Sequence, residues 1–278
     1  MRKDGRRLRN TDPMYTVACY IMKHRYDSMN MCEIDIPIAG MQAYLNQKRK
    51  EGTPMSHMGI VLSAYLRTAA EFPMLNRFIV NKRIYARNEF PVAMVVLKPG
   101  ETDGTMSKMY LDFHDTIFDV HRKMNEYIEK NRAAGDTNAT DDIIRKLLKI
   151  PGLVSIGVGL FKWLDKWGLL PKSIIDASPF HNSLVITNLA SIRTDFIYHH
   201  LYDFGTSSMF LAMGNMRDIP RRVKGEVVFE RCLPMGVVMD ERICSGAYFA
   251  RVFSRFKQYL TDPSLLEAPP AVINEDTD

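Results

Sequence analysis

The chain has 278 residues, 46% of them hydrophobic and 25% charged, an ordinary balance for a globular protein of one large or two small domains. The formal net charge is +5, but no basic stripe interleaved with aromatic residues and no nucleic-acid-binding motif accompanies it, so a nucleic-acid partner is not expected. No apolar segment follows the basic start, and charges at positions 162, 165 and 166 interrupt the longest apolar run, so we expect neither a secretory signal nor a membrane span and place the protein in the cytoplasm.

The four cysteines lie far apart and form no CxxC pair, which predicts free thiols in a reducing compartment. No HxxxH or HExxH spacing occurs, so a metal site is not expected. Both ends of the chain are charged: the first ten residues carry five Arg or Lys, and residues 262–278 carry five acids and no base. We interpret both ends as solvated tails, the acidic one beginning at about residue 267.

The first half of the chain predicts strands and two amphipathic helices. A strand is expected over residues 32–38, a hairpin turning at Asn81-Lys82, and another strand over residues 92–98. Between the first strand and the hairpin, a helix is capped by Ser56 and stopped by Pro73. Its apolar side chains recur at the spacing of one buried face, as do those of a helix that begins near Asp115; the two sets are Met58, Leu62, Tyr65, Leu66 and Ala69, and Ile117, Val120, Met124 and Ile128.

The second half begins with a helical stretch capped by Thr140, followed by an apolar segment over residues 150–171. Three strands and a last helix come next, over residues 183–188, 209–214, 233–239 and 247–260. Because the strands do not alternate one-to-one with helices, we predict an α+β fold in a single domain, with a mixed sheet covered by helices.

Residues 237–266 read VVMDERICSGAYFARVFSRFKQYLTDPSLL, a strand, a turn and a helix closed by Asp-Pro and two leucines. Asp240, Arg242 and Gly246 fit the pattern D-H-R-x-x-D-G. The segments LVITNLASI, MFLAMG and EFPMLNRFIV extend the similarity upstream, over residues 184–192, 209–214 and 71–80. In these features the chain resembles the chloramphenicol acetyltransferase-like family, which includes the catalytic domain of the 2-oxo-acid dehydrogenase dihydrolipoamide acyltransferases. Residues 140–175 have no counterpart and are interpreted as an insertion.

The resemblance implies a two-layer α+β domain that forms homotrimers, in some relatives assembled into cubic cages, and an activity that uses coenzyme A or acyl-coenzyme A. In that family a histidine removes a proton from the thiol of coenzyme A or dihydrolipoamide, and a Ser or Thr hydroxyl stabilises the resulting oxyanion. The matching positions here are Glu241 for the histidine, Thr187 for the hydroxyl, and Ser245 for an aspartate that pairs with an arginine to hold the loop. No lipoyl or subunit-binding segment precedes the domain, so a stand-alone protein is expected.

The exchange of histidine for Glu241 leaves two interpretations open. A free glutamate has a pKa of about 4.3, a poor match for a thiol of about 8.5, so Glu241 serves as a base only where burial raises its pKa. The alternative is a structural ion pair with Arg242 or Arg25. Thr187 is likewise either the oxyanion donor or an ordinary strand residue. Ser245 is interpreted only as a small residue that the turn before Gly246 tolerates.

His199 and His200 are candidate substitute bases, because imidazole has a suitable pKa and the cluster 198–205 lies between two of the matched strands. The alternative is that these histidines only form hydrogen bonds with the backbone. His181 is a weaker candidate for a substitute base.

In the apolar segment, side chains at helical spacing form a stripe, and Gly152, Gly157 and Gly159 predict a firm helix only beyond Leu160. The stripe is Leu153, Ile156, Leu160, Trp163, Leu164 and Trp167. Helices that lie on membranes usually carry many basic residues, whereas only two lysines and one acid flank this stripe. We therefore predict that the stripe contacts protein and not a membrane, either as a lid over the acyl channel or as a contact between trimers.

Three functions therefore remain open at this stage. The first is a stand-alone acyltransferase with a remodelled site, or an inactive member of that family. The second is a non-catalytic protein that forms trimers or cages, and the third is a protein that binds a membrane surface or acyl chains. A small-molecule acyl acceptor is compatible with the first function.

Overall fold

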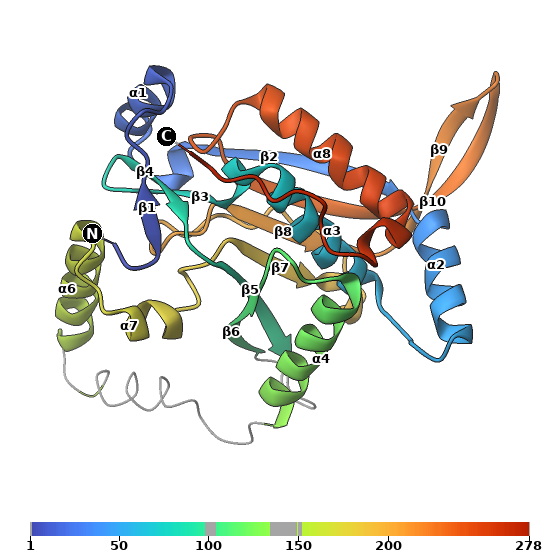
Figure 1. Ribbon diagram of the computed structural model, residues 1–278, viewed down its shortest axis with the longest axis horizontal. Helices are drawn as coiled ribbons and strands as arrows, with labels where there is room; N and C mark the ends of the chain where they lie inside the picture. Colours follow the sequence, from blue (N-terminus) through green and yellow to red (C-terminus); the bar gives the residue numbers. More distant parts are fainter. Residues whose placement is uncertain (1, 98–103, 134–148, 150–151, 278) are drawn as a thin grey trace.

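A seven-stranded mixed sheet forms the centre of the protein, whose computed structural model describes residues 2–97, 104–133, 149 and 152–277 (Figure 1). The strand order is β2-β10-β8-β7-β5-β6, with β9 paired to β10. The pairs β5–β7 and β7–β8 are parallel, and the others are antiparallel. The strands are β2 (Met29–Pro37), β5 (Phe90–Leu97), β6 (Gly104–Leu111), β7 (Leu184–Asn188), β8 (Met209–Met213), β9 (Arg217–Val223) and β10 (Glu226–Asp240).

One face of this sheet is covered by four helices, which bury the main core between them and the strands. They are α2 (Ala39–Lys50), α3 (His57–Glu71), α4 (Ile117–Ala133) and α8 (Gly246–Thr261). Ser56 caps α3 by accepting a hydrogen bond from the Gly59 N–H, and Pro73 follows its end. The apolar stripes predicted for α3 and α4 face this core, and α8 buries Phe249, Val252, Phe256 and Leu260 there.

The second face of the sheet is only partly covered. Its small apolar cluster, which includes Val185, Phe210 and Val238, lies beneath the strap, as we call residues 193–208. Further along the same face Met31, Val95 and Leu97 remain exposed. A sheet face that leaves apolar side chains exposed is typical of a subunit that packs against another protein.

A second, three-stranded sheet lies at one end of the molecule, in the order β1-β4-β3. Its strands are β1 (Gly5–Arg7), β3 (Arg77–Val80) and β4 (Arg83–Arg87). The hairpin turns at Asn81 and Lys82, both with positive φ, as predicted. The same end carries α1 (Pro13–Ile21), α6 (Leu153–Trp167) and α7 (Lys172–Ala177), whereas the β9–β10 hairpin projects from the opposite end (Figure 1). Short 3-10 helices are η1 (Arg25–Asp27), η2 (Pro73–Asn76), η3 (Leu189–Ile192) and η4 (Pro263–Leu266).

Several sequence predictions differ from the structure. Strands β1, β6 and β9 and helices α1, α2 and α7 were not predicted, β10 begins well before residue 233, and α6 is helical from Leu153 rather than only beyond Leu160. The predicted cap at Thr140 lies outside the described residues. Among the residues that are described, no helix is long and apolar enough to cross a membrane. The four cysteines are free thiols, as expected.

Most charged side chains of the two chain ends are exposed, as expected for solvated ends, but each end is also anchored to the domain by ion pairs. At the amino end Arg2 is buried in ion pairs with Asp4 and Asp165. At the carboxyl end Asp276 receives two hydrogen bonds from the Arg77 guanidinium, of 2.6 and 2.7 Å. Both ends are held because their charges meet opposite charges on the folded domain.

Candidate functional site

The loop between β10 and α8 is held by a buried ion pair between Asp240 and Arg242. The two side chains are 0% and 2% exposed, and the Arg242 guanidinium donates two hydrogen bonds to the carboxylate, of 2.8 and 2.6 Å. A third guanidinium bond, of 2.8 Å, goes to the Met22 carbonyl after α1. Burial opposes the charge of Arg242, but its bonds to Asp240 raise the pKa of the guanidinium overall. The loop is thus fixed by a bidentate pair.

Glu241, the first residue of this loop, is half-buried beside the edge strand β2. Its backbone N–H donates to the Ser28 carbonyl at 2.9 Å, and its Oε2 accepts a hydrogen bond from Asn30 Nδ2 at 2.8 Å. The alternative of an ion pair with Arg242 or Arg25 is not borne out by the geometry. Arg242 pairs with Asp240, and Arg25 donates to backbone carbonyls of Ile79 and Tyr202. One carboxylate oxygen of Glu241 is oriented by an amide, while the other makes no hydrogen bond within the described part of the chain.

Ser245 is more than a small residue tolerated in a turn, because it caps α8. Its Oγ accepts a hydrogen bond from the Tyr248 N–H at 3.3 Å, and its own N–H donates to the Tyr15 hydroxyl at 2.9 Å. The aspartate–arginine pairing that the resemblance assigned to this position is supplied by Asp240 and Arg242.

Thr187 lies far from Glu241 within one chain. It is paired with Ala212 of β8, and Ala212 is paired with Gly236 of β10. Glu241 stands five residues beyond Gly236, so it is about 17 Å further along the sheet and two strand spacings, about 10 Å, to the side. The backbones of the two residues are therefore about 20 Å apart, too far for their side chains to act on one reacting group.

The strap brings His199 and His200 to the end of the sheet where Glu241 lies. Two glycines let it lie against the strands: a Cβ at Gly236 would come within 2.4 Å of the Ile197 carbonyl oxygen, and one at Gly214 within 2.3 Å of the Phe196 nitrogen. The Leu201 N–H then reaches the sulfur of Met29, the residue paired with Asp240.

The histidine rings form part of an aromatic stack on the second face of the sheet. His199 stacks on Phe210 with ring centres 4.4 Å apart, and His200 stacks on His199 at 4.7 Å. His199 Nδ1 lies 2.8 Å from the His200 carbonyl oxygen. This contact agrees with the alternative that the histidines bond to the backbone. His200 is exposed, so it is the more accessible of the two rings. His181 lies elsewhere, fully buried beneath α6.

Comparisons with known proteins identify a family model and solved structures that the chain resembles. Residues 181–268 match the family model of the 2-oxoacid dehydrogenases acyltransferase (catalytic domain). Similar solved structures include a dihydrolipoamide acetyltransferase from Azotobacter vinelandii, the cubic core of the pyruvate dehydrogenase multienzyme complex, and a chloramphenicol acetyltransferase. Each is 12% identical to the chain, with TM-scores of 0.61, 0.60 and 0.55. The alignments cover 93%, 93% and 92% of this chain and 93%, 93% and 99% of the other. No curated protein matches the chain.

The chain has the chloramphenicol acetyltransferase-like fold. The predicted α+β class and the resemblance to the acyltransferase catalytic domains are thereby confirmed. Within this chloramphenicol acetyltransferase-like domain, the region matched by the family model contains Thr187, the strap and the Glu241 loop. The Azotobacter vinelandii structure addresses the role of a serine, a histidine and an asparagine in the catalytic mechanism of that enzyme.

A basic cleft of about 300 Å³ adjoins the loop and was not predicted from the sequence. Arg242 and Arg25 lie at its wall, and four lysines line it: Lys23, Lys82, Lys162 and Lys166. His24 Nδ1 lies 2.9 Å from Asp203 Oδ2 on the same cleft. Burial acts to raise the pKa of Asp203, but hydrogen bonds from His24 and the Arg25 N–H hold it below its usual value. No local sequence motif predicts the contact between His24 and Asp203, because the two residues are 179 positions apart in the chain.

Proposed function

We propose that the protein is a coenzyme A-dependent acyltransferase whose active site forms between two copies of the chain. Glu241 is the general base, and Thr187 of the neighbouring copy donates a hydrogen bond to the oxyanion. The observation that carries the proposal is the position of Glu241, on a loop fixed by the buried Asp240–Arg242 pair inside the region matched by the acyltransferase model. The activity itself is inferred by analogy from the fold and the family match.

The proposed chemistry uses few groups. Glu241 takes the proton of an attacking thiol, and the thiolate adds to the acyl carbonyl of the donor. The Thr187 hydroxyl stabilises the oxyanion of the tetrahedral intermediate. When the intermediate collapses, the leaving thiolate regains the proton from Glu241, so the base ends the cycle unprotonated. Asn30 orients the carboxylate by binding one oxygen and leaving the other for the proton.

Two features support a site shared between copies in a homotrimer. Thr187 and Glu241 cannot meet in one chain, and the second face of the sheet leaves Met31, Val95 and Leu97 exposed. A similar structure is the cubic core of a multienzyme complex, so relatives of this fold do assemble. In the proposed homotrimer, the rotation that carries one chain onto the next closes into a ring, and Thr187 of one copy lies near Glu241 of another.

Acyl transfer from a panel of acyl-coenzyme A donors to dihydrolipoamide tests the proposal. We expect Glu241→Gln to lower the rate by about 10²–10⁴-fold, as the loss of a general base does, and Glu241→His to retain or raise it. Glu230→Gln, on the distant hairpin, is the matched control and leaves the rate unchanged. If Glu241→Gln kept full activity and His200→Ala lost it, the general base would be His200 of the strap and not Glu241. A wild type inert with every donor would overturn the enzymatic function.

The second candidate is a non-catalytic assembly protein, favoured by one observation: a glutamate stands in place of the histidine of the family. In that case the protein forms trimers or larger particles without turnover. Light scattering of the purified protein, together with the transfer assay, separates the two functions.

A further inference from the structure

Helix α6 exposes its apolar stripe and buries its acid, the reverse of an ordinary surface helix. Asp165 is only 6% exposed, and Arg2 Nη2 lies 2.7 Å from its Oδ1 while Arg2 Nη1 donates to its carbonyl oxygen at 2.6 Å. His181 Nε2 lies 3.3 Å from the same carboxylate oxygen. These contacts orient α6 so that the stripe faces away from the domain. Four of its side chains, Ile156, Leu160, Trp163 and Trp167, are between 52% and 69% exposed.

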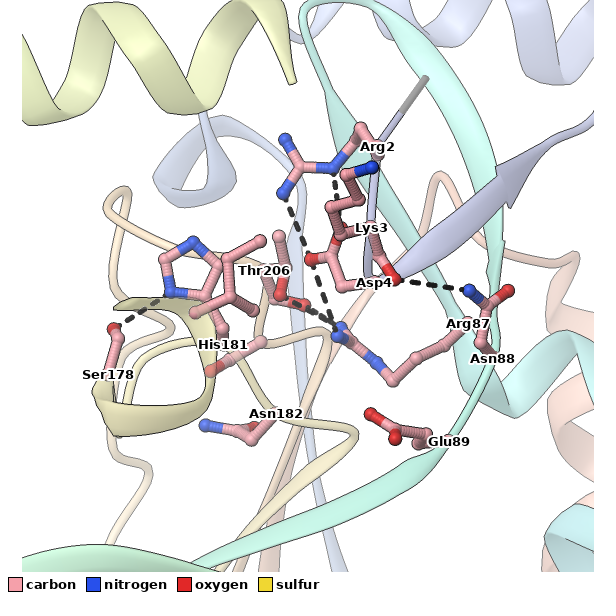
Figure 2. A network of polar contacts seen from close by, with 12 residues as sticks. Arg2, Lys3, Asp4, Arg87, Asn88, Glu89, Ser178, His181, Asn182 and Thr206 are labelled. Carbon is pink, nitrogen blue, oxygen red and sulfur yellow. Dashed lines mark hydrogen bonds and ion pairs between the residues drawn. The ribbon is translucent and has the colours of Figure 1, made fainter. Parts of the chain in front are cut away.

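The orientation of α6 rests on a polar network below it. Figure 2 shows Arg2 beside Asp4, Arg87 bonded to Thr206, and His181 Nδ1 at Ser178 Oγ. Arg2 and Arg87 are both buried, and Asp4 lies between them. Rotating α6 to bury its stripe would take the Asp165 carboxylate away from the buried Arg2 and His181, and breaking such a buried pair is more costly than exposing apolar side chains. The outward stripe is therefore built into the fold.

Helix α1 lies at the same end of the molecule (Figure 1) and carries a second exposed apolar stripe. Met14, Val17 and Ile21 of α1 are exposed at the spacing of one helical face. The basic cleft lies between the two helices: Lys23 follows α1, Lys82 lies over the Tyr20 ring, and two lysines belong to α6.

The charge of this end is positive once the ion pairs are taken into account. Both acids on the cleft have partners, Asp165 with Arg2 and Asp203 with His24. None of the four cleft lysines forms an ion pair within the described residues. At the back of the cleft, the Arg25 side chain is buried and its Nε has no hydrogen-bond partner there. The sequence-based objection to a membrane, two lysines against one acid on α6, therefore does not hold in the folded protein.

We propose that this end of the protein docks on an anionic lipid bilayer. The stripes of α1 and α6 insert at the level of the lipid headgroups, and the cleft lysines contact lipid phosphates. Tryptophan and lysine are suited to this boundary, because the indole ring and the lysine stem are apolar whereas their polar ends stay hydrated. A protein partner would instead have to desolvate the four lysines and supply acids to match them. The proposal is independent of the acyltransferase function.

The two tryptophans of the chain, Trp163 and Trp167, both lie on the α6 stripe and report binding directly. The full-length protein is mixed with vesicles of phosphatidylcholine containing about 30 mol % phosphatidylglycerol, and with vesicles of phosphatidylcholine alone. We expect co-flotation and a blue shift of the tryptophan emission with the anionic vesicles, both weakened by salt. An unshifted emission and no flotation with anionic vesicles overturn the proposal.

Variants separate the contributions of the stripe and the charges. Ile156→Ser with Leu160→Ser, and Lys162→Glu with Lys166→Glu, should each weaken vesicle binding by about tenfold or more while thermal unfolding is unchanged. Phe229→Ser is the matched control, since Phe229 is 72% exposed on the distant hairpin. If the stripe variant instead lowers the oligomer mass in light scattering and leaves vesicle binding intact, the stripe joins copies of the chain and the membrane proposal fails.

Discussion

At the scale of single residues, the Asp240–Arg242 pair determines whether the candidate active loop keeps its shape. Asp240→Asn removes the charge and leaves Arg242 buried without compensation, so we expect a loss of about 3–5 kcal/mol in the free energy of unfolding. Urea denaturation measures this loss. Asp218→Asn is the matched control, because its pair with Arg231 is exposed and worth about 0–1 kcal/mol. Equal stabilities for the two variants would contradict a structural role for the buried pair.

His181 makes stability depend on pH. Burial lowers the pKa of its imidazole, against the opposing effect of Asp165 and Asp4; Arg2 also faces it. Because the unfolded chain binds the proton more readily, stability is complete above the unfolded pKa of about 6.5 and falls as the pH drops below it. The carboxyls of Asp4 and Asp165 also have lowered pKa values, so their contributions are lost only at more acidic pH. Urea midpoints at pH 8, 6 and 5 should decline, and His181→Gln should flatten the decline between pH 6.5 and 5. A constant midpoint would refute the coupling.

The sequence identified Glu241, Thr187 and Ser245 as the positions of interest because they lie in contiguous motifs. It could not identify Asn30, which meets Glu241 only because β2 pairs with β10, 211 residues away in the chain. The same holds for His24 and Asp203. Side-chain partners that are joined by strand pairing or loop packing leave no local pattern in the sequence.

At the scale of elements, the strap depends on the small size of Gly236. A Cβ there would come within 2.4 Å of the Ile197 backbone oxygen, so Gly236→Ala should push the strap and its histidines away from the sheet. We expect a loss of about 1–3 kcal/mol in unfolding free energy, measured by urea denaturation. Gly157→Ala on α6 is the control, since no atom lies near its Cβ position, and it should stabilise by up to about 1 kcal/mol. A Gly236→Ala protein as stable as wild type would show that the strap can shift freely.

Periodicity predicted α3, α4 and α8 well because each presents one apolar face to one core. For α6 the same periodicity predicted the helix and its stripe but not which side is buried, since the partners of Asp165 are distant in sequence. Strand β9 has a basic, largely exposed sequence with no apolar alternation, so it could not be recognised before its pairing with β10 was known.

At the scale of the whole molecule, two observations bear on whether the protein acts as a monomer or as an oligomer. They are the exposed apolar side chains on the second face of the sheet and the separation of Thr187 from Glu241. A monomer would expose Met31, Val95 and Leu97 to water. In the proposed mechanism, Thr187 and Glu241 of one monomer would belong to two different sites. Association would cover the face and complete the site together, so activity should require the oligomer.

Complementation between two inactive variants tests this requirement. If the site is shared as proposed, Glu241→Gln and Thr187→Ala should each disable every site in their own homotrimer, because each site then needs one residue from each of two chains. When the two variants are co-expressed in equal amounts, random mixing joins an intact Glu241 to an intact Thr187 at about one quarter of the boundaries between chains, so about 25% of wild-type transfer activity should return. Mixed trimers of Glu241→Gln with Glu241→His provide a control that contains no Thr187 defect. If each site were complete within one chain, no mixture of the two inactive variants could restore activity, and a co-expressed sample as inactive as its parents would exclude the shared site.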